Sequence, residues 1–158
     1  MNKNIKKLYI FIFLILLASC GFKKINQNDN SAIYIQNIAV IGDKKISYLL
    51  KNNILLISKK DSKNKYDLKL KIDKTKTSKI KNTRGEVTRY SLSVIVNLVM
   101  KNINNQKKIS KSFAKNGDYD VAENHFKTIN NEKNMVKNII QQISNDIISF
   151  ITLDVKSK

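Results

Sequence analysis

The chain has 158 residues, 42% of them hydrophobic, which is enough for one domain with a single core. Its 30 basic residues outnumber 12 acidic ones, and a formal net charge of +18 is typical of proteins with an anionic partner such as nucleic acid, anionic lipid or an acidic protein surface. The alternative is that codon bias toward lysine, and not function, sets part of this charge, since only Arg84 and Arg89 are arginines. One cysteine and one histidine exclude a disulfide framework and a closed zinc site built from Cys and His alone.

The first predicted element, residues 1–19, is a bacterial lipoprotein signal peptide. The apolar run from Leu8 to Leu17 is shorter than the about 20 residues that a membrane-spanning helix needs, and three lysines precede it. The sequence Leu17-Ala18-Ser19-Cys20 fits a lipobox. The thiol of Cys20 would then carry a diacylglycerol, and its amino group, freed by cleavage, an N-acyl chain. The alternative is a plain cleavage site with a free or buried thiol.

Lipidation of Cys20 would hold the chain on the periplasmic face of a membrane, because several acyl chains on one residue suffice for stable anchoring. Gly21, rather than aspartate, follows the cysteine and favours the outer membrane under the sorting rule of Gram-negative lipoproteins. This location removes nucleic acid from the expected partners and leaves lipopolysaccharide, phospholipid headgroups or an acidic protein surface. No cofactor is expected beyond the acyl groups on Cys20.

Residues 20–31 are polar and lack apolar periodicity, so we expect a lipidated flexible tether before a single domain at residues 32–158. In that domain, apolar periods of two predict strands and periods of 3.6 predict helices. The expected elements are a strand from Ala32 to Ile41, a helix from Lys44 toward Ser58 capped by Asp43, strands over Tyr66–Thr77, Val87–Met100 and Ile109–Tyr119, and a C-terminal helix capped by Thr128 or Asn130.

This order predicts an α+β fold, a two-layer sandwich in which a four-stranded, mainly antiparallel sheet carries two helices on one face (β-α-β-β-β-α). A loop at Lys79–Glu86 and a turn at Asn102–Lys107 would connect the antiparallel strands. The residues of the first strand expected on its buried face are Ile33, Ile35, Ala39 and Ile41. The apolar residues expected on the uncovered sheet face are Ile38, Val40, Ile95 and Phe113. Either a partner covers them or they are ordinary exposed apolar residues.

The combined pattern resembles the LptE family of lipopolysaccharide-assembly lipoproteins, in the shorter form typical of alphaproteobacteria. The matching features are Cys20-Gly21-Phe22, the first strand and helix ending at Leu55, Tyr66-Asp67-Leu68-Lys69-Leu70 with its hairpin partner Tyr90-Ser91-Leu92, the region of Tyr119 and the C-terminal helix. They span the mature chain. A proline-containing segment that often follows in the family is replaced here by Lys23-Lys24-Ile25-Asn26-Gln27.

The resemblance implies a non-catalytic outer-membrane lipoprotein that sits inside the large β-barrel LptD, assists its assembly and contacts lipopolysaccharide on its way to the cell surface. In the family, basic residues near strand ends and loops bind lipopolysaccharide. The matching candidates here are Lys79, Lys81, Arg84 and Arg89. Such side chains pair with lipid A phosphates, and arginine does so in a bidentate manner. A solvated basic loop is the alternative interpretation of each residue.

No catalytic site is expected. The single histidine, His125, follows Asp118, Asp120 and Glu123 in the sequence, but there is no Gly-x-Ser-x-Gly elbow, His-Glu-x-x-His pair or glycine-rich phosphate loop. His125 is therefore interpreted as a surface loop residue. Two other functions remain open: a periplasmic lipoprotein accessory to a cell-wall synthase or to an inner-membrane ABC lipid transporter, and a generic basic lipid-binding domain.

Overall fold

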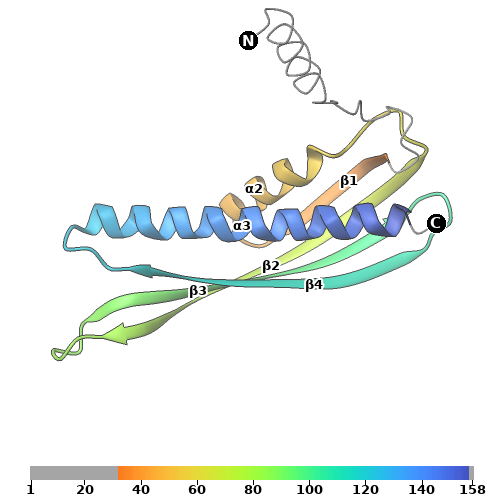
Figure 1. The fold of residues 1–158 in the computed structure, drawn as a ribbon. Helices are drawn as coiled ribbons and strands as arrows, with labels where there is room; N and C mark the ends of the chain where they lie inside the picture. Colours follow the sequence, from red (N-terminus) through yellow and green to blue (C-terminus); the bar gives the residue numbers. More distant parts are fainter. Residues whose placement is uncertain (1–31, 157–158) are drawn as a thin grey trace, which may run out of the picture.

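The computed structural model describes residues 32–156, which fold into four strands and two helices joined by short connections (Figure 1). The elements in chain order are β1 (Ile33–Ile41), α2 (Lys44–Leu55), β2 (Asn64–Lys81), β3 (Val87–Asn102), β4 (Lys108–Asp120) and α3 (His125–Lys156). This order confirms the predicted β-α-β-β-β-α sandwich. The predicted signal peptide, the tether and Cys20 lie outside the described residues.

The strands form one sheet in chain order, β1-β2-β3-β4. β1 runs parallel to β2, because α2 carries the chain back across the sheet, whereas short turns make β2–β3 and β3–β4 antiparallel. β2 has 18 residues and β3 has 16, but β1 has only nine. The β2–β3 hairpin therefore extends past β1. We call the end with the turn at residues 82–86 the distal end, and the end where β1 begins the proximal end.

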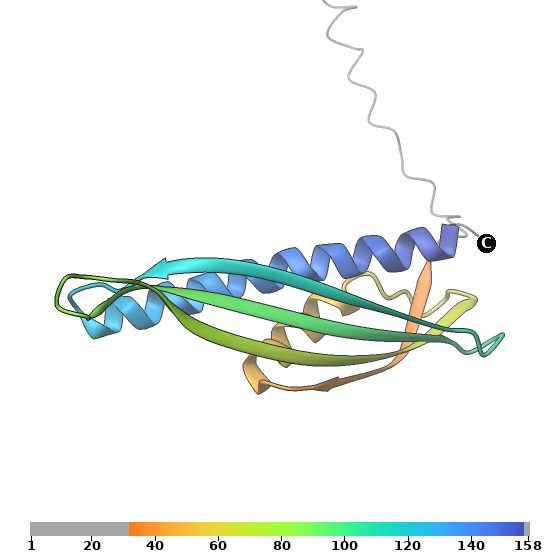
Figure 2. The same cartoon turned by 90° about the horizontal axis from the view of Figure 1, so that it is seen from below.

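Both helices cover the same face of the sheet, as the view from below shows (Figure 2). α3 has 32 residues and runs along the length of the sheet, about 48 Å at 1.5 Å per residue. α2 has 12 residues, about 18 Å, and lies only over the proximal part. The helix layer is therefore two helices wide at the proximal end and one helix wide at the distal end.

The core lies between the sheet and the helices. It is built from alternate residues of β2 and β3 and from one stripe of each helix, as the periodicities predicted. The most deeply buried of these side chains are Tyr66, Leu68, Leu70, Leu92, Val94, Val96, Leu98, Met100, Ile46, Leu50, Ile54, Ile139, Ile140, Ile143, Ile147 and Ile151. One polar side chain joins the helices within this layer, where buried Ser144 accepts a hydrogen bond of 3.1 Å from the Asn53 side chain.

The predicted faces of β1 are wrong beyond its first three residues. The pairing with β2 slips between Ile35 and Asn37, which inserts one extra residue into β1. Because side chains alternate with a period of two, such a bulge moves every later side chain to the opposite face. Ile38 and Val40 therefore pack against the core, and the residues expected to be buried there, Ala39 and Ile41, are exposed.

The predicted position of Phe113 on the uncovered sheet face is also wrong. Phe113 pairs with Val96, is buried on the helix side and makes an edge-to-face contact with Phe150 of α3 at 6.0 Å between ring centroids. Ile95 lies on the uncovered face as predicted, with 39% of its surface exposed.

The distal connections differ from the prediction at two places. β2 continues to Lys81, so the loop expected from Lys79 begins only at residue 82. α3 begins at His125, upstream of both predicted caps, and the Asn124 side chain accepts a hydrogen bond of 2.7 Å from the backbone of Phe126. His125 is thus the first residue of an exposed helical turn and not a loop residue.

Candidate functional site

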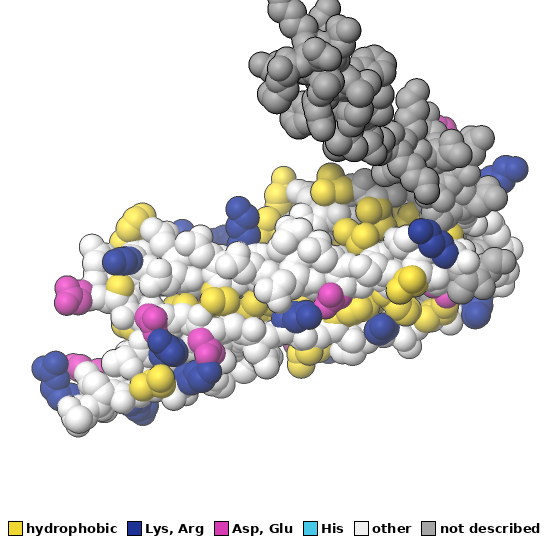
Figure 3. Space-filling view, in the orientation of Figure 1, with side chains coloured by type: hydrophobic (Ala, Val, Ile, Leu, Met, Phe, Trp, Pro, Cys, Tyr) yellow, Lys and Arg dark blue, Asp and Glu magenta, His cyan; other side chains and the backbone are white. Residues whose placement is uncertain are grey.

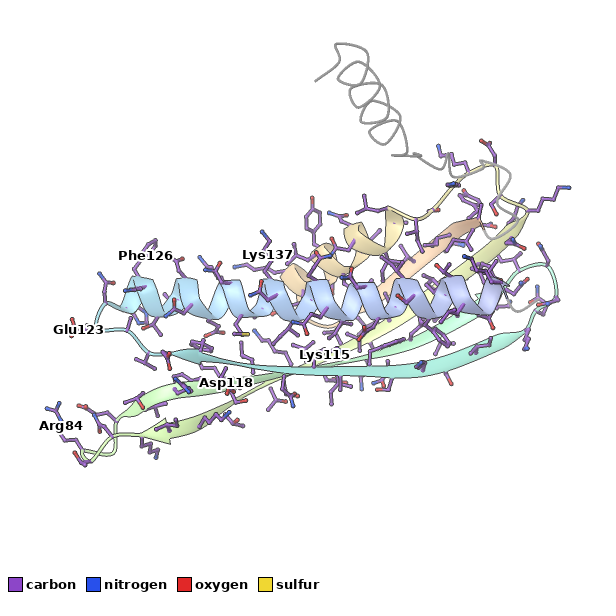
Figure 4. The ribbon with its side chains drawn as sticks, in the orientation of Figure 1. Arg84, Lys115, Asp118, Glu123, Phe126 and Lys137 are labelled. Carbon is purple, nitrogen blue, oxygen red and sulfur yellow. The ribbon has the colours of Figure 1, made fainter. Side chains whose placement is uncertain are left out.

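The four predicted cationic residues lie close together at the distal end. Lys79 and Lys81 are among the last three residues of β2, and Arg89 is the third residue of β3. Arg84 lies in the turn between these strands (Figure 4). The hairpin register brings them together, because Ile80 pairs with Arg89 and Lys81 with Val87.

Two of these cations are bound to carboxylates of β4. The Lys79 ammonium reaches across β3 and donates a hydrogen bond to Asp118. Arg89 Nε donates to Asp120 Oδ1 at 2.6 Å. The hydrogen bonds from Lys79 and Ser91 lower the pKa of Asp118, so this carboxylate stays ionised to lower pH than usual. A phosphate would have to compete with these carboxylates.

The turn residues are held by their own hydrogen bonds. The Asn82 carboxamide oxygen accepts from the backbone of Arg84 at 2.9 Å and of Glu86 at 3.0 Å, and its nitrogen donates to Glu86 Oε2 at 2.7 Å. Arg84 Nε lies 3.7 Å from the same carboxylate. Lys81 makes no ion pair within residues 32–156. Acidic and basic side chains are accordingly intermixed at the distal end (Figure 3).

A second cluster, which the sequence did not reveal, lies on the helix side of the same end. Glu132 of α3 accepts hydrogen bonds from Lys76 Nζ at 2.8 Å and from the Tyr119 hydroxyl at 2.7 Å. Lys76 also lies 4.1 Å from the centroid of the Tyr90 ring, which stacks on Tyr119 at 5.6 Å. We call these four residues the distal clamp. It joins three strands to α3 at the level where the apolar core ends.

The sign of the Glu132 pKa shift predicts how the distal clamp responds to acid. The hydrogen bonds from Lys76 and Tyr119 lower the pKa of Glu132 below its usual value of 4.5. A carboxylate with a lowered folded-state pKa stabilises the fold above its usual pKa, and this contribution is lost as the pH falls through the lowered value.

Glu132→Gln should therefore lower the free energy of unfolding at pH 7 by about 1 kcal/mol, a modest value because both charged groups are partly exposed. The variant should also lose less stability than the wild type as the pH falls below about 4.5. Urea unfolding at a series of pH values measures both effects. The control is Glu123→Gln, which removes an exposed carboxylate without an ion pair in the described part of the chain. Parallel pH curves for wild type and Glu132→Gln would contradict the assignment.

The helix layer narrows from two helices to one at the residue where α2 begins. A groove of 740 Å³ lies there, beside α3. We call it the step groove. Its apolar lining comes from both helices and consists of Ile46, Leu49, Ile129 and Val136. Its polar lining contains five lysines, which are Lys44, Lys45, Lys74, Lys133 and Lys137, against two carboxylates, Asp43 and Glu132.

A smaller hollow of 330 Å³ lies on the uncovered sheet face near the proximal end. Lys69, Lys101 and Lys108 line it together with Asp67 and Val99. The register places these residues in neighbouring rows, since Asp67 pairs with Lys101 and Lys101 with Lys108. Sequence reasoning could have found this set from the strand alternation, but it did not, because a lysine-rich chain has lysines on every exposed face.

No group of three or more His, Cys, Asp or Glu side chains within residues 32–156 is arranged to hold a metal ion. His125 is exposed on the first turn of α3. Over the same described residues, the helices are too short or too polar to cross a membrane.

The comparisons with known proteins show the fold. No family model and no curated protein matches the chain. Among solved structures, a protein from Caulobacter crescentus CB15, described provisionally as a lipoprotein, matches with a TM-score of 0.59 and 14% sequence identity over 81% of this chain and 93% of its own. Rare lipoprotein B from Shewanella oneidensis matches with a TM-score of 0.57 and 16% identity over 76% of this chain and 97% of its own. This chain therefore has a fold found among bacterial lipoproteins.

Proposed function

We propose that this chain is a non-catalytic outer-membrane lipoprotein that acts as an LptE-like subunit of the lipopolysaccharide translocon. In this role it sits against an LptD-like β-barrel, assists assembly of that barrel and contacts lipopolysaccharide during its insertion into the outer leaflet. The observation that carries the proposal is the likeness in fold to two lipoproteins over most of their length, together with the lipobox at Cys20. The rare lipoprotein B neighbour supports the resemblance at the level of fold.

The uncovered sheet face supplies a surface for the barrel partner. On β3 this face carries Ile95 and Val99, each 39% exposed, and the register places Ala114 of β4 beside Ile95. Ser93 and Asn97 alternate with them on the same strand and can form hydrogen bonds with a partner. A face of this kind, with both apolar and uncharged polar side chains, suits contact with the polar interior of a large barrel.

The distal cations supply the proposed contact with lipopolysaccharide. Lys79, Lys81, Arg84 and Arg89 lie on one projecting hairpin. Three of them pair with carboxylates that keep 29–64% of their side-chain surface exposed, so a phosphate can compete for these cations. Phosphates that replace these carboxylates would receive charge-assisted hydrogen bonds. Lys81 is the member of this group with no ion pair to give up in the described part of the chain.

Site-specific crosslinking in the native membrane tests this function. A photoreactive amino acid at Asn97, on the uncovered face, should capture a large outer-membrane β-barrel that mass spectrometry identifies. The same group at Gln142, exposed on α3, controls for capture by the helix side. Capture of a cell-wall synthase or an inner-membrane permease from Asn97, without a barrel, would favour the accessory role and contradict the translocon proposal.

A further inference from the structure

We infer that the step groove binds one phosphorylated, acylated glycolipid molecule, with acyl chain against its apolar lining and phosphate against its lysines. This inference rests on the proposed function for the choice of a glycolipid. It adds a site on the helix side of the molecule, separate from the four distal cations on the hairpin.

Both helices contribute apolar residues to the lining of the step groove. Leu49 of α2 and Val136 of α3 are half-buried, and Ile129 is 37% exposed, while Ile46 beneath them is fully buried. A groove of 740 Å³ lies within the range of about 300–1,000 Å³ that is typical of small-molecule sites. Apolar area left open between two helices gains free energy when an acyl chain covers it.

The cations around this lining are largely uncompensated. Lys74 lies 3.7 Å from Asp43, but Lys44, Lys133 and Lys137 make no ion pair within residues 32–156. Lys137 projects from α3 next to the start of α2 (Figure 4). The step groove thus differs from the distal hairpin, where three of the four cations already have carboxylate partners.

Two lysines of the step groove lie at a position that is unfavourable for the stability of α2. Lys44 and Lys45 occupy the first turn of α2, where the helix dipole disfavours cations, and this turn contains no acidic residue. The backbone groups there are already bound, since the Asp43 side chain accepts from the backbone of Lys45 at 2.9 Å and of Ile46 at 3.1 Å. The lysine side chains, and not the helix end, are therefore available for an anion. Residues that are unfavourable for local structure, such as cations in the first turn of a helix, are expected at functional sites.

Lipid binding by groove variants tests the inference on the full-length lipidated protein in detergent. The groove variant is Lys133→Glu with Lys137→Glu. The matched control is Lys51→Glu on α2 with Lys127→Glu on α3, which changes the net charge by the same amount but outside the groove lining. The probes are detergent-dispersed lipopolysaccharide, dispersed phosphatidylglycerol and inorganic phosphate. Circular dichroism confirms that each variant is folded, and Asn97 crosslinking measures the barrel contact separately.

The groove variant should bind lipopolysaccharide at least tenfold more weakly than the wild type, and the control should change less than threefold. Inorganic phosphate should not compete, because it has no acyl chain for the apolar lining.

Equal losses of lipopolysaccharide binding in the groove variant and the control would mean general charge attraction and would overturn the inference. A matching loss for phosphatidylglycerol would assign the groove to a phospholipid and also overturn it. Loss only in Lys81→Glu with Arg84→Glu would place the glycolipid at the distal hairpin instead. Failure of Asn97 to capture a barrel overturns the proposed function but leaves these binding results interpretable.

Discussion

Leu50→Ala is expected to lower the free energy of unfolding by about 2–5 kcal/mol, the range measured for removal of a fully buried leucine side chain. Leu50 lies in the middle of the buried stripe of α2 and has no exposed surface. The substitution removes apolar contacts and leaves a cavity where α2 meets the rest of the core. Native domains are stable by only about 5–15 kcal/mol, so this single change is a large fraction of the total.

Equilibrium urea unfolding followed by circular dichroism measures this change. The control is Tyr48→Ala on the same helix, which removes a larger side chain that is 68% exposed and should change stability by less than about 0.5 kcal/mol. Equal effects of the two substitutions would show that α2 does not pack on the sheet through the stripe described here.

The fold was predictable from the sequence because most elements have a clear apolar period. Leu68, Leu70 and Ile72 alternate with charged residues on β2, and the stripe of isoleucines on α3 recurs every three or four residues. Each such pattern has one stable solution, in which the apolar side faces the opposite layer. The type and order of the elements follow from these patterns alone.

The error in β1 has a specific physical cause. The apolar residues in the second half of β1 are consistent with either face, because Ile38 and Val40 alternate with Ala39 and Ile41. The bulge between Ile35 and Asn37 arises in the pairing with β2 and decides which face these residues occupy. No residue of β1 indicates this bulge in the sequence. The start of α3 was missed for a related reason: residues 125–135 are mostly exposed, so they lack the apolar stripe on which a helix prediction depends.

The candidate sites were predictable only in part. The distal cations could be located because they belong to one hairpin, but Asp118 lies 39 residues from Lys79 and Asp120 lies 31 residues from Arg89 in the sequence. The distal clamp joins Lys76 to Glu132, 56 residues apart, and the step groove depends on where α2 begins relative to α3. Charge composition predicts an anionic partner, but pairing in the fold decides which cations would be available to it.

The largest expected effect concerns the membrane anchor. Cys20→Ala should abolish lipidation, and the protein should move from the membrane fraction to the soluble periplasmic fraction. Each buried methylene of an acyl chain contributes about 0.8 kcal/mol, and two or more chains give stable attachment. Their removal leaves only electrostatic attraction between lysines and anionic headgroups, which salt screens.

Two measurements separate anchoring from export. In the first, incorporation of a labelled fatty acid into wild type and Cys20→Ala is compared, with Ser19→Ala as a control that keeps a small residue before the cysteine. In the second, residues 1–19 are exchanged for a signal peptide that is cleaved without lipidation, so that the Cys20→Ala chain is released in processed form and its membrane fraction is measured after a high-salt wash. Labelled fatty acid on Cys20→Ala, or a wild-type protein with Met1 retained and a bare thiol, would contradict the lipoprotein assignment and remove the basis of the translocon proposal.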